Sequence, residues 1–223
     1  MRKFFTLALS VLCLQAFAQT QQSDPKATQQ SDPKATQILN GVSANYKALK
    51  AVKADFTVKV ENGANSTKDV QTGTIYVKGN KYKVQLKNQE ITSDNSTVWT
   101  YLKDANEVQV NNYDPDENTI TPSQIFTIYE KDFFYAFVEE KKVNGKVIQF
   151  IELTPHDKSK PYFKIRLGID KVAKAVQSAV VFDKNGNRYT YEIKAFTPNP
   201  NIADTFFTFD TKAHAGVEVV DLR

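Results

Sequence analysis

Residues 81–87 read KYKVQLK, a stretch in which Tyr82, Val84 and Leu86 alternate with lysine and glutamine. Successive side chains of a β-strand point to opposite faces, so a period of two indicates a strand with one apolar and one polar face. The preceding segments 54–60 and 75–77 show the same alternation. Because antiparallel sheets commonly pack one face on a core and leave the other in water, we expect an antiparallel sheet here.

The strand-like pattern continues to the end of the chain. Further strands are predicted at 97–102, 107–111, 133–138, 147–153, 162–169, 176–182, 188–196, 205–209 and 217–220. Asn144-Gly145 and Asn185-Gly186 separate neighbouring segments, and Asn-Gly is typical of tight hairpins. About eleven strands without alternating long helices predict a mainly β (α+β) fold, a large antiparallel meander that curls toward a barrel.

Two helices are expected beside this sheet. Asp32 and Pro33 suit the N-cap and the first helical position, and they begin a helix over 33–48. Its apolar face comprises Ile38, Leu39, Val42, Tyr46 and Leu49. A second helix is predicted over 122–129, where Thr121, Pro122 and Gln124 form the start of a capping box. Together the two helices are expected to cover the mouth of the curved sheet.

The N-terminal region has the order of a secretory signal peptide. A basic pair, Arg2-Lys3, precedes an apolar run from Phe4 to Leu14 and the small-residue site Ala16-Phe17-Ala18. We therefore expect 1–18 to be removed near Ala18. QQSDPKAT at 21–28 recurs at 29–36, and Pro33 would interrupt a helix that began in the first copy, so residues 19–31 are expected to form a flexible polar leader. The remaining 32–223 are expected to form a single β domain.

Composition argues against several function classes. The 223 residues carry 29 basic and 25 acidic side chains, and loss of Arg2 and Lys3 leaves 27 against 25. Nucleic-acid binding usually requires clustered positive charge, so we do not expect it. The two histidines, His156 and His214, lie in no catalytic motif, so we expect no enzyme. Asp114–Asn118 lacks the glycine and glutamate of a calcium loop, so we expect no metal site.

Aromatic side chains remain, with 15 Phe, 10 Tyr and one Trp. They could fill an ordinary core. In a wide or unclosed barrel, however, side chains alone do not fill the interior, and an apolar lining becomes a ligand cavity.

Several motifs resemble one family when they are taken in order. They are Val52-Lys53-Ala54-Asp55-Phe56, Gly73-Thr74-Ile75-Tyr76-Val77-Lys78, Ser93-Asp94-Asn95-Ser96-Thr97-Val98-Trp99-Thr100-Tyr101, Glu152-Leu153-Thr154-Pro155, Phe182-Asp183-Lys184-Asn185-Gly186 and the ending from Phe207 to Val219. Over most of residues 38 to 223, the chain resembles the periplasmic outer-membrane lipoprotein carrier proteins (LolA-like).

The resemblance implies an unclosed β-barrel whose helices form a lid over a hydrophobic cavity. It implies a periplasmic carrier that takes acylated lipoproteins from an inner-membrane ABC transporter toward the outer membrane, where a receptor would accept them. No cofactor is implied, and we expect a monomer. Members of the same superfold also serve as envelope-stress sensors, so a lipid- or lipoprotein-sensing regulatory module is the alternative.

One motif departs from the family pattern. The family usually has Lys-Arg-Pro after the second strand, where the arginine holds the lid shut. This chain has Lys78-Gly79-Asn80-Lys81, so Lys78 or Lys81 would have to latch the lid.

The lipid-binding residues are predicted from one parity of the strands and from the lid. From the strands they are Phe56, Val58, Val60, Ile75, Val77, Tyr82, Val84, Leu86, Trp99, Tyr101, Val108 and Val110, and from the lid Ile125, Phe126 and Tyr129.

The lid assignment predicts the behaviour of Phe126→Glu. A short peripheral helix contributes few of the contacts of a sheet, so the melting temperature should stay within a few degrees, a change on the order of 1 kcal/mol or less. Retention of a lipopeptide should fall. Failure of the variant to fold would instead identify Phe126 as a core residue, because burial of an unpaired carboxylate is costly.

Overall fold

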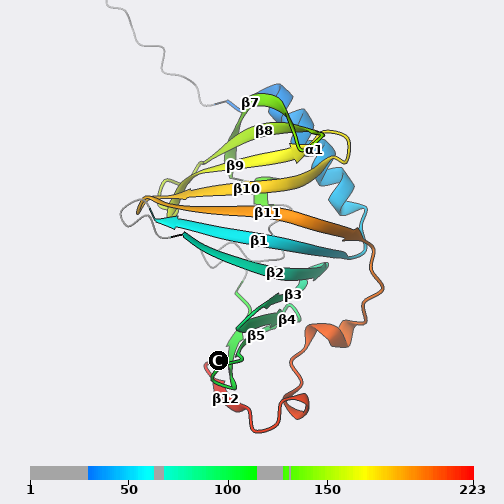
Figure 1. Ribbon diagram of the computed structural model, residues 1–223, viewed down its shortest axis with the longest axis vertical. Helices are drawn as coiled ribbons and strands as arrows, with labels where there is room; N and C mark the ends of the chain where they lie inside the picture. The colour runs from blue at the N-terminus through cyan, green and yellow to red at the C-terminus, as the bar shows by residue number, and fades with distance from the viewer. Residues whose placement is uncertain (1–29, 63–67, 115–127, 131) are drawn as a thin grey trace, which may run out of the picture.

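The computed structural model describes residues 30–62, 68–114, 128–130 and 132–223. In this part of the chain, helix α1 (Pro33–Lys47) lies beside a sheet of 12 strands (Figure 1). The strands are β1 (Val52–Asn62), β2 (Lys68–Lys78), β3 (Lys81–Leu86), β4 (Gln89–Ser93), β5 (Thr97–Leu102), β6 (Glu107–Asn112), β7 (Phe133–Val143), β8 (Lys146–Pro155), β9 (Tyr162–Asp170), β10 (Ala175–Asp183), β11 (Asn187–Pro198) and β12 (Glu218–Asp221). The 3-10 turns are η2 (Ile128–Glu130), η3 (Asp204–Phe207) and η4 (Thr211–Ala213).

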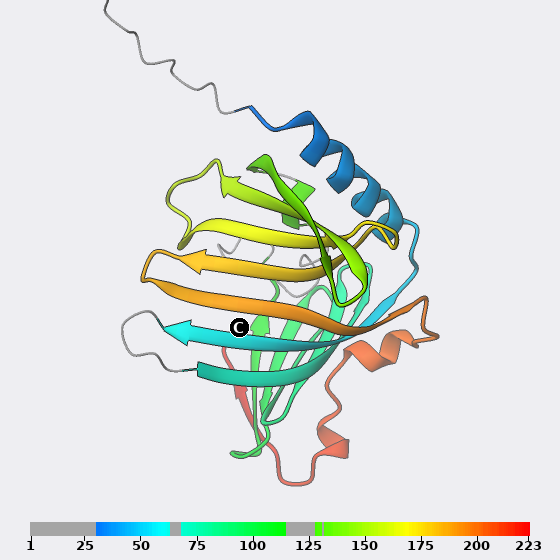
Figure 2. The same ribbon diagram turned by 45° about the horizontal axis from the view of Figure 1, so that its top comes forward.

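The strand order is β12-β6-β5-β4-β3-β2-β1-β11-β10-β9-β8-β7. Every pairing is antiparallel except that of β12 with β6, which is parallel. The sheet curves strongly, and its edge strands β7 and β12 do not pair with each other (Figures 1 and 2). The predicted unclosed, mainly antiparallel β-barrel is therefore confirmed. The single meander is wrong, because β1 pairs with β11 and thereby joins two meanders, β1–β6 and β7–β11.

Two strand assignments also differ from the sequence prediction. The prediction missed β4, since its sequence QEITS has a single large apolar residue and so shows no alternation. The strand predicted at 205–209 is instead the turn η3. A strand would direct Phe206 and Phe207 to opposite faces. The 3-10 turn lets the two rings pack against each other, with centroids 5.5 Å apart, and Phe207 is completely buried.

Helix α1 begins as predicted. Asp32 is the N-cap, and its Oδ1 accepts hydrogen bonds from the backbone N of Lys34 at 2.7 Å and of Ala35 at 3.4 Å. The buried side of the helix includes Leu39, Val42 and Tyr46. Burial raises the pKa of Tyr46 to about 12, against the opposing effect of a hydrogen bond from the backbone N of Val176.

The other N-terminal and lid predictions fall largely outside the described residues. They include the signal peptide at 1–18, most of the leader, and positions 122–127 of the second helix with Ile125 and Phe126. The end of that segment, 128–130, forms a 3-10 turn in which Tyr129 is 1% exposed. None of the helices in the described ranges is long and apolar enough to span a membrane.

Asp32 also ties the helix to the sheet edge, which generates a prediction. Its backbone N donates to Tyr135 O at 2.8 Å, and its Oδ2 accepts from the backbone N of Phe137 at 3.4 Å in β7. Asp32→Ala should lower the free energy of unfolding by about 1 to 2 kcal/mol, because the N-cap is lost. Asp32→Asn, which keeps a capping oxygen, should retain most of the wild-type free energy of unfolding. Urea unfolding would measure both, and equal losses would contradict the capping role.

Candidate functional site

The register of the pairings defines two faces of the sheet. Directly opposite residues share a face, so Val52, Val77 and Tyr82 lie together. We call this the inner face, because side chains on it from both meanders join α1 in one apolar cluster. The opposite side, which carries Tyr76 and Lys83, is the outer face.

Eight of the predicted lining residues lie on the inner face. Their side chains come from β1, β2 and β3, and they are Phe56, Val58, Val60, Ile75, Val77, Tyr82, Val84 and Leu86. Ile75, Val77, Tyr82 and Val84 are buried in the core. Toward the other end of β1, Val58 and Val60 are only partly buried. The inner face therefore has a covered end and a partly exposed end.

The partly exposed end extends onto β11, where the sequence analysis named no residue. Tyr191 lies opposite Val58, and Tyr189 lies opposite Val60. Both tyrosines are partly buried. Burial raises the pKa of the Tyr191 hydroxyl, with a smaller contribution from Tyr189. The alternation of 188–196 could have revealed these tyrosines, but which parity faces inward depends on the pairing with β1.

Phe56 lies between the two ends and packs closely on β2. A Cβ atom added to Gly73 would come within 2.9 Å of the Phe56 ring and 2.7 Å of Leu86 Cδ2. Gly73 therefore lets two apolar side chains of the inner face approach the sheet backbone.

The prediction is wrong for Trp99, Tyr101, Val108 and Val110, because these residues lie on the outer face. Tyr82 pairs with Ser93, and Ser93 pairs with Val98, so Val98 is the inner-face residue of β5. Trp99 therefore points outward with its partner Val110, and Tyr101 with Val108. Because β4 was not predicted, the sequence could not show which alternate residues of β5 lie on the same face as those of β3.

The outer face over β2–β6 is covered by residues 199–217, which we call the C-terminal strap. Phe209 and His214 of the strap lie beside Tyr101, with ring centroids 5.2 and 4.6 Å away. Val108 is completely buried. The apolar residues of β5 and β6 thus belong to a second, smaller core under the strap.

A pair of lysines clamps the strap. Lys78 Nζ and Lys81 Nζ lie 2.6 and 2.8 Å from the two carboxylate oxygens of Asp204, and Lys78 also donates to Ile202 O at 2.9 Å. These hydrogen bonds, from Lys78 and then Lys81, lower the pKa of Asp204 to about 2. Both lysines thus hold the strap on the outer face, whereas the sequence pattern predicts that one of them latches the lid.

The described residues contain no group of three or more His, Cys, Asp or Glu side chains arranged to hold a metal ion. Their apolar inner face offers a surface for binding hydrocarbon.

Comparison with known proteins agrees with this architecture. Residues 47–210 match the family model of the outer membrane lipoprotein carrier protein LolA. The chain belongs to the LolA family. No curated protein sequence matches it significantly.

Solved structures are also similar to this chain at low sequence identity, and the first of those that follow shows the same fold. An uncharacterized conserved protein from Thermus thermophilus is 13% identical, with a TM-score of 0.57 over 84% of this chain and 99% of that one. LprF from Mycobacterium bovis is 14% identical, with a TM-score of 0.49 over 78% and 97% of the two chains. A LolA superfamily protein from Nitrosomonas europaea is 12% identical, with a TM-score of 0.45 over 79% and 98%.

The clamp predicts a pH-dependent protection of the strap. Because the pKa of Asp204 is lowered in the folded state, its contribution is present above about pH 4 and is lost as the pH falls toward 2. At neutral pH, Asp204→Asn should speed hydrogen exchange in residues 199–208. The difference from the wild type should shrink between pH 4 and 2. Asp157→Asn, in an exposed turn, is the control, and a difference that persists at pH 2 would contradict the clamp.

Proposed function

We propose that this protein is a periplasmic carrier that binds the acyl chains of lipoproteins on its inner face and moves them from the inner to the outer membrane. The observation that carries the proposal is the partly exposed end of that face, where Val58, Val60, Tyr189 and Tyr191 continue the apolar core outward. Membership of the LolA family supports it.

The energetics of an acyl chain explain why such a face is useful. Each methylene buried from water contributes about 0.8 kcal/mol, so one long chain exposed to water costs roughly 10 kcal/mol. A lipoprotein with two or three chains therefore needs shielding to cross an aqueous compartment. The carrier must also release its cargo, so its affinity has to stay comparable to that of the acceptor.

The proposed transport route requires a partner that delivers the lipoprotein and one that accepts it. An inner-membrane ABC transporter supplies the acylated lipoprotein, and the outer membrane or a receptor in it accepts the cargo. The chain itself needs no cofactor and performs no covalent step, because shielding and release are binding events. The signal-peptide pattern of 1–18 agrees with a periplasmic location.

A lipid- or lipoprotein-sensing regulatory module is the second candidate. Lys78 and Lys81 were the candidates to latch the lid of a carrier, but both bind Asp204 on the outer face. This position favours the sensing module. Depletion followed by membrane fractionation separates the two candidates. Loss of a carrier strands lipoproteins at the inner membrane, whereas loss of a sensor changes transcription alone.

Val58→Glu tests the lining directly. A carboxylate at the partly exposed end would have to lose water beneath an acyl chain, which costs at least about 1 to 3 kcal/mol. Affinity for a fluorescent triacylated lipopeptide should therefore fall about tenfold or more. Binding titrations would measure it, and native mass spectrometry of the purified protein should show co-purifying lipid in the wild type.

Thr190→Glu is the matched control. It adds the same charge in the neighbouring strand, but on the outer face and opposite Lys59. This variant should bind the lipopeptide like the wild type. Equal affinity of all three proteins, or no lipopeptide binding by the wild type, would refute the proposed function.

A further inference from the structure

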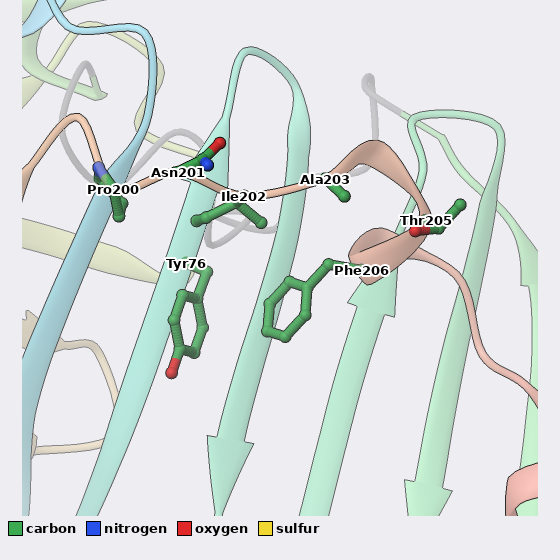
Figure 3. A pocket seen from close by; sticks show the side chains of 7 residues that line it. All are labelled: Tyr76, Pro200, Asn201, Ile202, Ala203, Thr205 and Phe206. Carbon is green, nitrogen blue, oxygen red and sulfur yellow. The ribbon is translucent and has the colours of Figure 1, made fainter.

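The outer face carries a hollow between β2 and the C-terminal strap (Figure 3). Its volume is about 460 Å³, within the usual range of ligand sites. The residues that line it are Tyr76, Pro200, Asn201, Ile202, Ala203, Thr205 and Phe206. The lining is largely apolar, and none of it belongs to the inner face.

The walls of the hollow are held in place. The rings of Tyr76 and Phe206 meet edge to face, with centroids 4.9 Å apart. The strap is anchored before the hollow, where Asn199 Oδ1 accepts from the backbone N of Lys50 at 2.7 Å. Within it, Ile202 O accepts from Lys78, and Asp204 is clamped. The hollow is therefore built before any ligand arrives.

Lysines surround this apolar hollow. Lys53 Nζ lies 5.8 Å from the centre of the Tyr76 ring, and Lys83 Nζ lies 4.7 Å from that of Phe206. Lys78 reaches the wall at Ile202 O. Lys83 is paired with Glu90 Oε1 at 3.0 Å, so the excess of positive charge beside the hollow comes from Lys53 and from Lys78 and Lys81, which share the single carboxylate of Asp204. A ligand that fits has an apolar group and negative charge next to it.

We propose that this hollow is a docking site for an acidic segment of a partner protein, which inserts one large apolar or aromatic side chain. The shape favours a protein over a membrane surface, because a protruding side chain can enter a hollow and a flat bilayer cannot. The charge favours flanking Asp or Glu, which would approach Lys53 and Lys78. Since the hollow lies opposite the inner face, the partner can bind while the inner face is occupied.

Selection from a displayed library of random peptides, each about 12 residues long, tests this site. The peptides enriched on the wild type are expected to combine a large apolar side chain with Asp or Glu. They should lose binding to Thr205→Trp, which fills the hollow from an exposed position of the strap. Thr211→Trp places the same side chain outside the hollow and should bind like the wild type.

A second variant tests the charge. Lys53→Glu should weaken the selected peptides about fivefold or more, whereas Lys142→Glu, on β7, should not. Thermal melting checks that each variant is folded.

Peptides that bind Thr205→Trp unchanged, or that lack acidic residues, would overturn the proposal. The proposal would also be overturned if the wild type sedimented with phosphatidylglycerol vesicles and Thr205→Trp did not, because the site would then recognise a membrane. Lipopeptide binding to the inner face is measured separately and does not bear on this outcome.

Discussion

The antiparallel pairing of β1 with β11 holds the two halves of this protein together. It runs from Val52 opposite Pro198 to Asn62 opposite Asn187, with one irregularity after Asp55. Each meander alone is an open sheet with an exposed edge and an unshielded apolar face. Joined through β1 and β11, they curve around one apolar cluster that α1 covers from the side. The same pairing places Tyr191 beside Val58, and so creates the partly exposed surface proposed to bind acyl chains.

The two faces of the sheet are covered by different segments of the chain. On the inner face, α1 packs over one end and leaves apolar side chains partly exposed at the other. On the outer face, Phe209 and His214 of the C-terminal strap pack on Tyr101, and Val108 and Phe207 are completely buried. The ion pairs of Asp204 are exposed, and such pairs contribute little to stability, so burial of Phe207 carries more of the attachment. The ion pairs instead fix where the strap crosses β2 and β3. That placement forms the hollow beside Tyr76.

Local alternation predicted which residues face inward wherever every strand was recognised and each strand pairs with the next. Alternation in β1, β2 and β3 identified the inner-face residues from Phe56 to Leu86, because each strand was recognised and its parity passes directly to the next. The start of α1 was also predictable, since the capping by Asp32 is local. For Trp99 and Tyr101 the same reasoning failed. An unrecognised strand, β4, lies between them and β3, and period-two patterns carry no information about face across a missing element.

The sequence by itself determined the fold class, the inner parity of the first three strands and the family resemblance, because these depend on residue order over short distances. Only the tertiary structure decided that β1 pairs with β11, that Tyr189 and Tyr191 face inward, and that Lys78 and Lys81 bind Asp204. Each of these contacts joins residues more than 100 positions apart. Such contacts depend on how the sheet curves and where the strap returns, and no local periodicity encodes that geometry.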